Sequence, residues 1–152
     1  METVNRTSFA VEQRLRDSVA DCPTAGLIVE IKYCPKGTSR GWPASGTYYR
    51  RTARRPQGKL IRLRINRLNR YPVGMMFKTP SYFKRRNAQG EEVVYQEIKR
   101  VDLRTPEDLL TAIFLHEFSH YLDHIAGRNG RYKQTKADQF ALARLKELGI
   151  KV

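Results

Sequence analysis

The sequence predicts an α+β fold in which an N-terminal helix and a small twisted β-sheet are followed by two closing helices. Three segments between residues 27 and 103 show the alternating or β-branched character of strands, whereas apolar residues after residue 104 recur at helical spacing. The chain has 152 residues, of which 40% are hydrophobic and 29% charged. This length and composition fit a single domain, residues 1–152, with a packed core.

The first third of the chain predicts one helix and one strand. The helix is expected at residues 7–20, where apolar side chains recur at near-helical spacing: Phe9, Val11, Leu15 and Val19. The β-rich segment Leu27–Tyr33 predicts a strand. Repeated glycine and proline in residues 35–58 then predict a long loop or an irregular hairpin.

The middle of the chain predicts two more strands. Residues 59–66 alternate Ile and Leu with Arg, which is typical of a half-buried strand with a basic outer face. Residues 71–90 contain Pro72, Gly74, Pro80 and Gly90, and predict another irregular stretch. Residues 92–103 form the third expected strand.

The two closing helices have clear boundaries. The first is expected at about 106–126, because Thr105 can cap it, Pro106 suits the first helical position, and Gly127 ends it. The second is expected at about 135–148, after a polar turn and before Gly149.

The first closing helix contains the pattern His-Glu-x-x-His at residues 116–120. His116 and His120 lie on one helix face about 6 Å apart, which suits joint coordination of one metal ion. Glu117 is displaced about 100° around the helix, so it flanks the metal and can take a proton from a metal-bound water. Apolar residues occupy the opposite face of this helix, which predicts that the histidine pair faces a site.

A catalytic zinc ion usually takes three protein ligands, and Asp138 is the best candidate for the third. It lies on the apolar face of the last helix, where a carboxylate needs a partner. The alternative is a capping box formed by residues 135–138. His124 lies two turns from His116 and is expected to stop short of the metal. Asp123 can either orient His120 or be a solvated surface residue.

With these residues in view, the chain resembles the zincin superfamily of HExxH metallopeptidases. The run LHEFSHYLDH and the downstream run KADQFALARL are most similar to the small ImmA/IrrE-type proteases, over residues 105–148. Such proteins often carry Glu just before the Ala of the second run, whereas this chain has Lys136 there. A second group to which the chain is similar is the SprT-like group of basic HExxH proteases that act on DNA-bound proteins.

The resemblance implies a minimal zincin-like fold and a zinc-dependent endopeptidase. In this reading His116, His120 and Asp138 bind Zn²⁺, and Glu117 is the general base that activates the metal-bound water. Zincin substrates lie extended along a sheet edge, for which residues 59–66 or 92–103 are the expected strands. The competing hypothesis is a basic nucleic-acid-binding protein in which the metal site is structural or inactive.

The positive charge is concentrated in the middle of the chain. The protein carries 29 Lys and Arg against 15 Asp and Glu, and residues 40–104 hold 17 of these basic residues but only 4 acidic ones. Arg residues beside aromatic ones suit phosphate contacts and base stacking. The sequence predicts a nucleic-acid partner that is bound through six arginines: Arg50, Arg51, Arg54, Arg55, Arg62 and Arg64. An acidic protein partner and plain solubility are the alternatives.

Two further features bear on where the protein acts. No apolar run approaches the roughly 20 residues that span a bilayer, and the N-terminus lacks the apolar core of a signal peptide. The two cysteines, Cys22 and Cys34, are too few for a disulfide scaffold and are expected to be reduced thiols. Together these features predict a cytoplasmic protein without a membrane partner.

Overall fold

The computed structural model describes residues 1–35, 42–128 and 133–152, and it confirms the α+β class. Part of the expected loop at 35–58 and most of the expected polar turn before the last helix lie outside the described residues. The elements in chain order are β1 (Glu2–Asn5), α1 (Glu12–Ser18), β2 (Ile28–Tyr33), β3 (Ala44–Tyr49), β4 (Leu60–Ile65), β5 (Val73–Arg86), β6 (Glu92–Leu103), α2 (Pro106–Ile125) and α3 (Gln134–Glu147).

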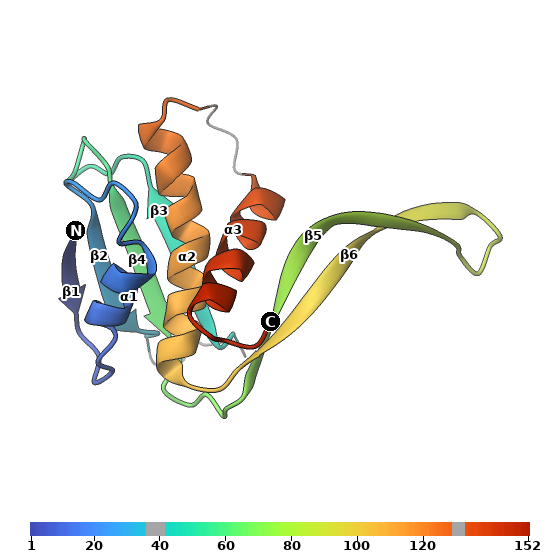
Figure 1. Ribbon diagram of the computed structural model, residues 1–152, viewed down its shortest axis with the longest axis horizontal. Coiled ribbons are helices and arrows are strands. Elements are labelled where there is room, and N and C mark those ends of the chain that lie inside the picture. Colours follow the sequence, from blue (N-terminus) through green and yellow to red (C-terminus); the bar gives the residue numbers. More distant parts are fainter. Residues whose placement is uncertain (36–41, 129–132) are drawn as a thin grey trace.

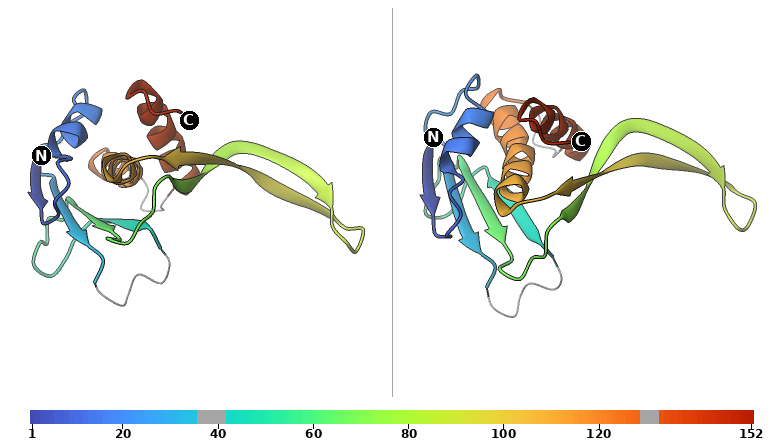
Figure 2. Two further views of the ribbon diagram at one scale, coloured as in Figure 1. Left: turned by 90° about the horizontal axis from the view of Figure 1, so that it is seen from below. Right: turned by 60° about the horizontal axis from the view of Figure 1, so that its bottom comes forward.

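The body of the protein is a four-stranded sheet covered by helices on one face (Figure 2). The strand order is β1-β2-β4-β3, with β1, β2 and β4 parallel and β3 antiparallel to β4. Side chains alternate between the two faces, so Leu63 and Ile65 of β4 are fully buried under the helices while Arg62 and Arg64 point to the other face. Strand β3 forms one edge of this sheet and lies next to α2.

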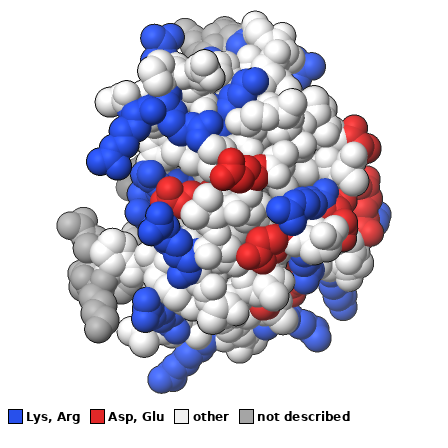
Figure 3. All heavy atoms as spheres, turned by 90° about the vertical axis from the view of Figure 1, so that its left-hand side faces the viewer, with Lys and Arg blue, Asp and Glu red and all other residues white. Residues whose placement is uncertain are grey.

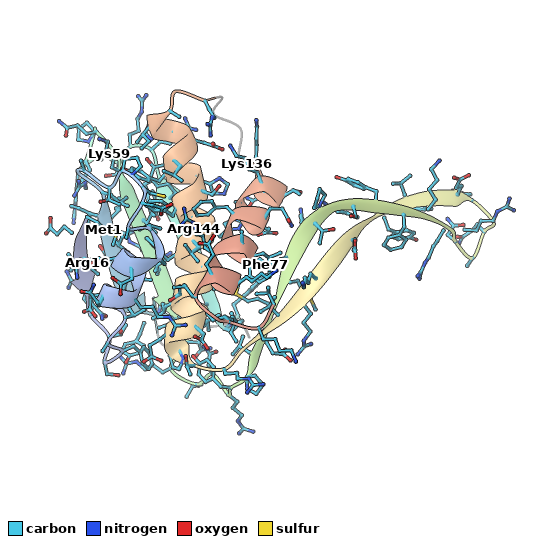
Figure 4. The ribbon with its side chains drawn as sticks, viewed as in Figure 1. Met1, Arg16, Lys59, Phe77, Lys136 and Arg144 are labelled. Atoms are coloured by element: carbon cyan, nitrogen blue, oxygen red, sulfur yellow. The ribbon has the colours of Figure 1, made fainter. Side chains whose placement is uncertain are left out.

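A long β-hairpin, which we call the arm (residues 73–103), extends away from this body (Figure 1). It consists of β5 and β6, which pair antiparallel in a separate two-stranded sheet. Its root is packed: Phe77, labelled in Figure 4, is fully buried next to α3. Its outer half exposes large side chains, including Tyr82 at 63% and Val94 at 58%.

Strands β1 and β5 lie where the sequence predicted no strand, and β3 lies in the segment 35–58, which was expected to be a long loop or an irregular hairpin. The sequence of β3 includes Gly46, at which an added Cβ would lie only 2.5 Å from Ile113 Cγ2, so glycine permits close packing against α2. Strand β5 contains Pro80, which falls where the pairing register shifts between Lys78 and Tyr82. A residue without an N–H is tolerated at such an irregularity, so proline does not end the strand.

Helix α1 is shorter than the expected span of residues 7–20. The side chain of Asn5 holds the chain before this helix in a turn, because Oδ1 accepts from the backbone N–H of Thr7 and Nδ2 donates to the carbonyl of Phe9. The helix therefore begins at Glu12. The remaining predicted elements agree with the structure to within two residues.

The hydrophobic core lies between the sheet and α2, which is buried on most of its sides. Among its core residues, Leu110, Phe114 and Phe118 are fully buried. No described helix combines the length and the apolar character needed to cross a membrane. Cys22 and Cys34 are both free thiols.

Candidate metal centre

Helix α2 carries His116, Glu117 and His120 in its middle. A capping bond fixes the start of this helix, since Thr105 Oγ1 accepts from the backbone N–H of Asp108 at 3.1 Å. The rings of His116 and His120 lie one helical turn apart, with 5.1 Å between their centroids. This spacing allows both imidazoles to reach one metal ion.

Asp138 reaches the histidine pair from α3. Its Oδ1 lies 2.7 Å from Nδ1 of His116, and its Oδ2 accepts the backbone N–H of Lys78, also at 2.7 Å. The alternative, a capping box at residues 135–138, does not form, because α3 begins at Gln134 without a side-chain cap. A carboxylate on Nδ1 leaves Nε2 of His116 as the nitrogen that can face a metal.

Gln134, in the first turn of α3, is a polar neighbour that sequence reasoning missed. Its side-chain amide lies near both His116 and His120, where it favours a higher pKa of each imidazole. The spacing from Gln134 to Asp138 is four residues, which puts both side chains on the same face of α3. The four-residue spacing from Asp138 was the signal in the sequence for Gln134, but a neutral amide is not among the usual zinc ligands.

The surroundings of the two histidines set their pKa values in opposite directions. Burial alone would lower the pKa of His116, but the hydrogen bond that His116 donates to Asp138 and the negative charges of Glu117 and Asp138 outweigh burial and raise it. Burial, helped by the charge of His116, lowers the pKa of His120 to about 4. His120 is therefore neutral at neutral pH, which is the form that binds a metal.

Glu117 lies against the edge strand β3. Only 9% of the residue is exposed, and its Cγ would be 2.8 Å from a Cβ added at Gly46. Burial raises the pKa of Glu117, although the charge of His116 and a hydrogen bond from the backbone of Tyr48 oppose the rise. A carboxylate held in this way is a stronger base than an exposed one.

The other acidic and histidine side chains near the end of α2 have different partners. Nδ1 of His124 is hydrogen-bonded to the hydroxyl of Tyr48 at 2.5 Å. Asp123 Oδ1 accepts from Lys136 at 2.6 Å and from Arg128 at 2.8 Å, so it ties the end of α2 to the start of α3. The structure thus brings Lys136, the residue that departs from the ImmA/IrrE-type pattern, to Asp123.

A metal ion held by the histidine pair needs a further protein ligand. Within residues 1–35, 42–128 and 133–152, no three His, Cys, Asp or Glu side chains form a group that could hold a metal ion. The amide oxygen of Gln134, whose side chain lies near both imidazoles, could supply this ligand. Two imidazoles, one oxygen donor and a water make up the four-coordinate set of a catalytic zinc site.

Comparison with known proteins does not assign this chain to a family. No family model matches it, and no curated protein or solved structure matches it either. Its function therefore has to be argued from the geometry of the site.

Proposed function

We propose that this protein is a zinc-dependent endopeptidase in which His116 and His120 bind the metal and Glu117 is the general base. The observation that carries the proposal is the position of Glu117, a buried carboxylate between the histidine pair and the edge of the sheet. A zinc ion bound there would activate a water molecule and polarise the peptide carbonyl. Glu117 would take the proton of that water and pass it to the leaving amine.

Two side chains of α3 compete for the third ligand position. The sequence-based assignment of Asp138 as the third metal ligand stays a prediction, because in the structure its Oδ1 is hydrogen-bonded to Nδ1 of His116. That geometry favours a positioning role for Asp138, which fixes the ring so that Nε2 faces the metal. It also makes the Gln134 amide oxygen a candidate for the third donor, since the side chain of Gln134 acts on the pKa of both imidazoles.

The edge strand β3 is the element best suited to bind an extended substrate. The strand expected for this role at 59–66 corresponds to β4, which is paired on both sides by β2 and β3. The other expected strand, β6, belongs to the arm. Strand β3 ends the sheet and borders Glu117, so a peptide added to its outer edge would lie next to the general base.

The decisive experiment combines metal analysis with a proteolysis assay on purified protein. We expect about one zinc per chain and hydrolysis of an unfolded protein substrate. His116→Ala and His120→Ala should lose both metal and activity, whereas Glu117→Gln should keep the metal and lose activity.

Glu107→Gln is the matched control for this experiment. It makes the same chemical change in the first turn of the same helix, away from the histidine pair, and should keep full activity. Full activity of Glu117→Gln would overturn the peptidase proposal. It would favour the competing hypothesis of a nucleic-acid-binding protein with a structural or inactive metal site.

A further inference from the structure

The basic residues of this protein are not spread over the whole middle segment. Residues 42–72 contain nine Lys and Arg and no Asp or Glu, whereas the arm, residues 73–103, contains six basic and four acidic residues. The arm is thus nearly balanced. Most of the positive charge that the sequence places in the middle segment belongs to β3, β4 and the loops that flank β4.

Some of the cations lie on the sheet face that the helices do not cover. Arg62 and Arg64 of β4 and Lys32 of β2 point to this face, and Lys32 pairs in register with Arg64. Figure 3 views the body from the side of β1, and Lys and Arg side chains run along its left-hand edge, where the uncovered sheet face is seen in profile. We call this surface the basic band, and its members are Lys32, Arg50, Arg51, Arg54, Arg55, Lys59, Arg62 and Arg64.

The loop between β3 and β4 continues the band past the end of the sheet. Lys59, at the end of this loop, lies at the top of the sheet in Figure 4. A hollow of about 330 Å³ in the loop is lined by Arg54, Arg55, Pro56 and Gln57. The loop is closed tightly, since a Cβ at Gly58 would fall 1.6 Å from the carbonyl oxygen of Arg50. The loop cations are therefore held on a constrained backbone.

Most cations of the band have no acidic partner among the described residues. Two carboxylates point to this face by register, Glu2 of β1 and Glu30 of β2. Glu30 accepts a hydrogen bond from Arg62 at 3.1 Å and lies 3.8 Å from Lys32. No described Asp or Glu forms an ion pair with the other members, Arg50, Arg51, Arg54, Arg55, Lys59 and Arg64. In contrast, Arg14, Arg128 and Arg144 elsewhere on the body each have a carboxylate.

We propose that the basic band binds the sugar-phosphate backbone of a nucleic-acid duplex. A row of cations on the outer face of β4 and along the loop before it, most of them without an acidic partner among the described residues, matches a regular line of phosphates. The two tyrosines of β3 offer little stacking surface to single-stranded bases, because Tyr48 is buried and the guanidinium of Arg62 lies over the Tyr49 ring, although Trp42 just before β3 is 70% exposed. We take a duplex as the partner because its phosphates form a regular line that matches the cations, and contacts to phosphates are independent of base sequence.

The proposal can be tested by fluorescence anisotropy with a labelled 20-base-pair DNA duplex of mixed sequence. The full-length protein should bind, and the affinity should fall steeply with salt, with a logarithmic slope of about 0.9 for each phosphate neutralised. The triple variant Arg54→Gln, Arg55→Gln, Arg64→Gln should weaken binding about tenfold or more and reduce the slope by about 3. Arg62 is left unchanged because its replacement would remove the hydrogen bond to Glu30 and leave that carboxylate without its closest cation.

A matched control removes the same charge from the arm. Lys84→Gln, Arg85→Gln, Arg86→Gln also lowers the net charge by three, but it should change the affinity less than about twofold. Thermal melting of both variants shows whether they are folded. Equal loss of affinity in the two variants would mean that only net charge matters and would overturn the proposal. So would absence of duplex binding at low salt, tighter binding to a single strand of the same sequence, or tighter binding to polyglutamate.

Discussion

Nδ1 of His116 and Oδ1 of Asp138 lie 2.7 Å apart, although 22 residues separate the two in the chain. The second oxygen of the same carboxylate accepts the backbone N–H of Lys78, at the root of the arm. One acidic side chain therefore connects α2, α3 and β5. This arrangement fixes which nitrogen of His116 faces the proposed metal.

The roles of the two α3 side chains can be separated by zinc titration against a competing chelator. We expect Gln134→Glu to tighten zinc binding, because a carboxylate replaces a neutral amide at the third position. Asp138→Asn should weaken it about 10–100-fold, as is typical for the partner of a metal-bound histidine. Unchanged affinity in Gln134→Glu, together with loss in Asp138→Asn, would return the third position to Asp138.

The hydrogen bond between His124 and Tyr48 should stabilise the fold without contributing to metal binding. His124→Ala and Tyr48→Phe each remove this bond, and a double-mutant cycle should give a coupling of about 1 kcal/mol in the free energy of unfolding. Zinc content should stay at about one per chain in both variants. A large drop in zinc affinity of His124→Ala would show instead that His124 is a ligand.

Gly46 should be essential for the position of Glu117. In Gly46→Ala the new methyl group would approach Ile113 Cγ2 and Glu117 Cγ, so we expect the Glu117 side chain to be displaced. Activity should fall strongly while zinc content is retained. Ser45→Ala, at the exposed neighbouring position on the opposite face of β3, is the control and should be nearly as active as the wild type. Equal activity of the two variants would contradict the prediction.

The outer half of the arm should be dispensable for the fold of the body. Replacing residues 83–95 with Asn-Gly would join Tyr82 to Gln96, which face each other in the hairpin. The bonds that anchor the root, from Gln96 to Thr135 and from Lys78 to Asp138, are kept. Circular dichroism should show a cooperative melt close to that of the full chain, and zinc content should not change. A molten or aggregated variant would show that the body needs the outer arm.

The parts of the fold that follow from local sequence signals were predictable. The limits of α2 follow from the Thr105 cap and Pro106, and the alternation in β4 marks its buried side. What local signals could not reveal is close packing between distant segments. Gly46 was interpreted as a loop glycine because only the approach of α2 makes it a requirement of a strand.

The candidate site was predictable only in part for a similar reason. The spacing of His116, Glu117 and His120 on one helix is visible in the sequence. The geometry of α3 is not, since it depends on how this helix packs against α2 and β5. Asp138 was expected either to bind the metal or to cap the helix, and the sequence could not show that its carboxylate lies next to Nδ1 of His116.

The contacts at Lys78 also have a consequence for self-association. An isolated two-stranded ribbon exposes backbone groups along both edges, which can template pairing with other chains. At the root of β5 this edge is closed, because Asp138 accepts the N–H of Lys78 and Gln139 donates to its carbonyl. Pro80 then lacks an N–H, and the three consecutive cations Lys84, Arg85 and Arg86 follow near the tip. A foreign strand approaching β5 therefore meets an interrupted, charged edge, which disfavours cross-chain β-pairing and aggregation through this side of the hairpin.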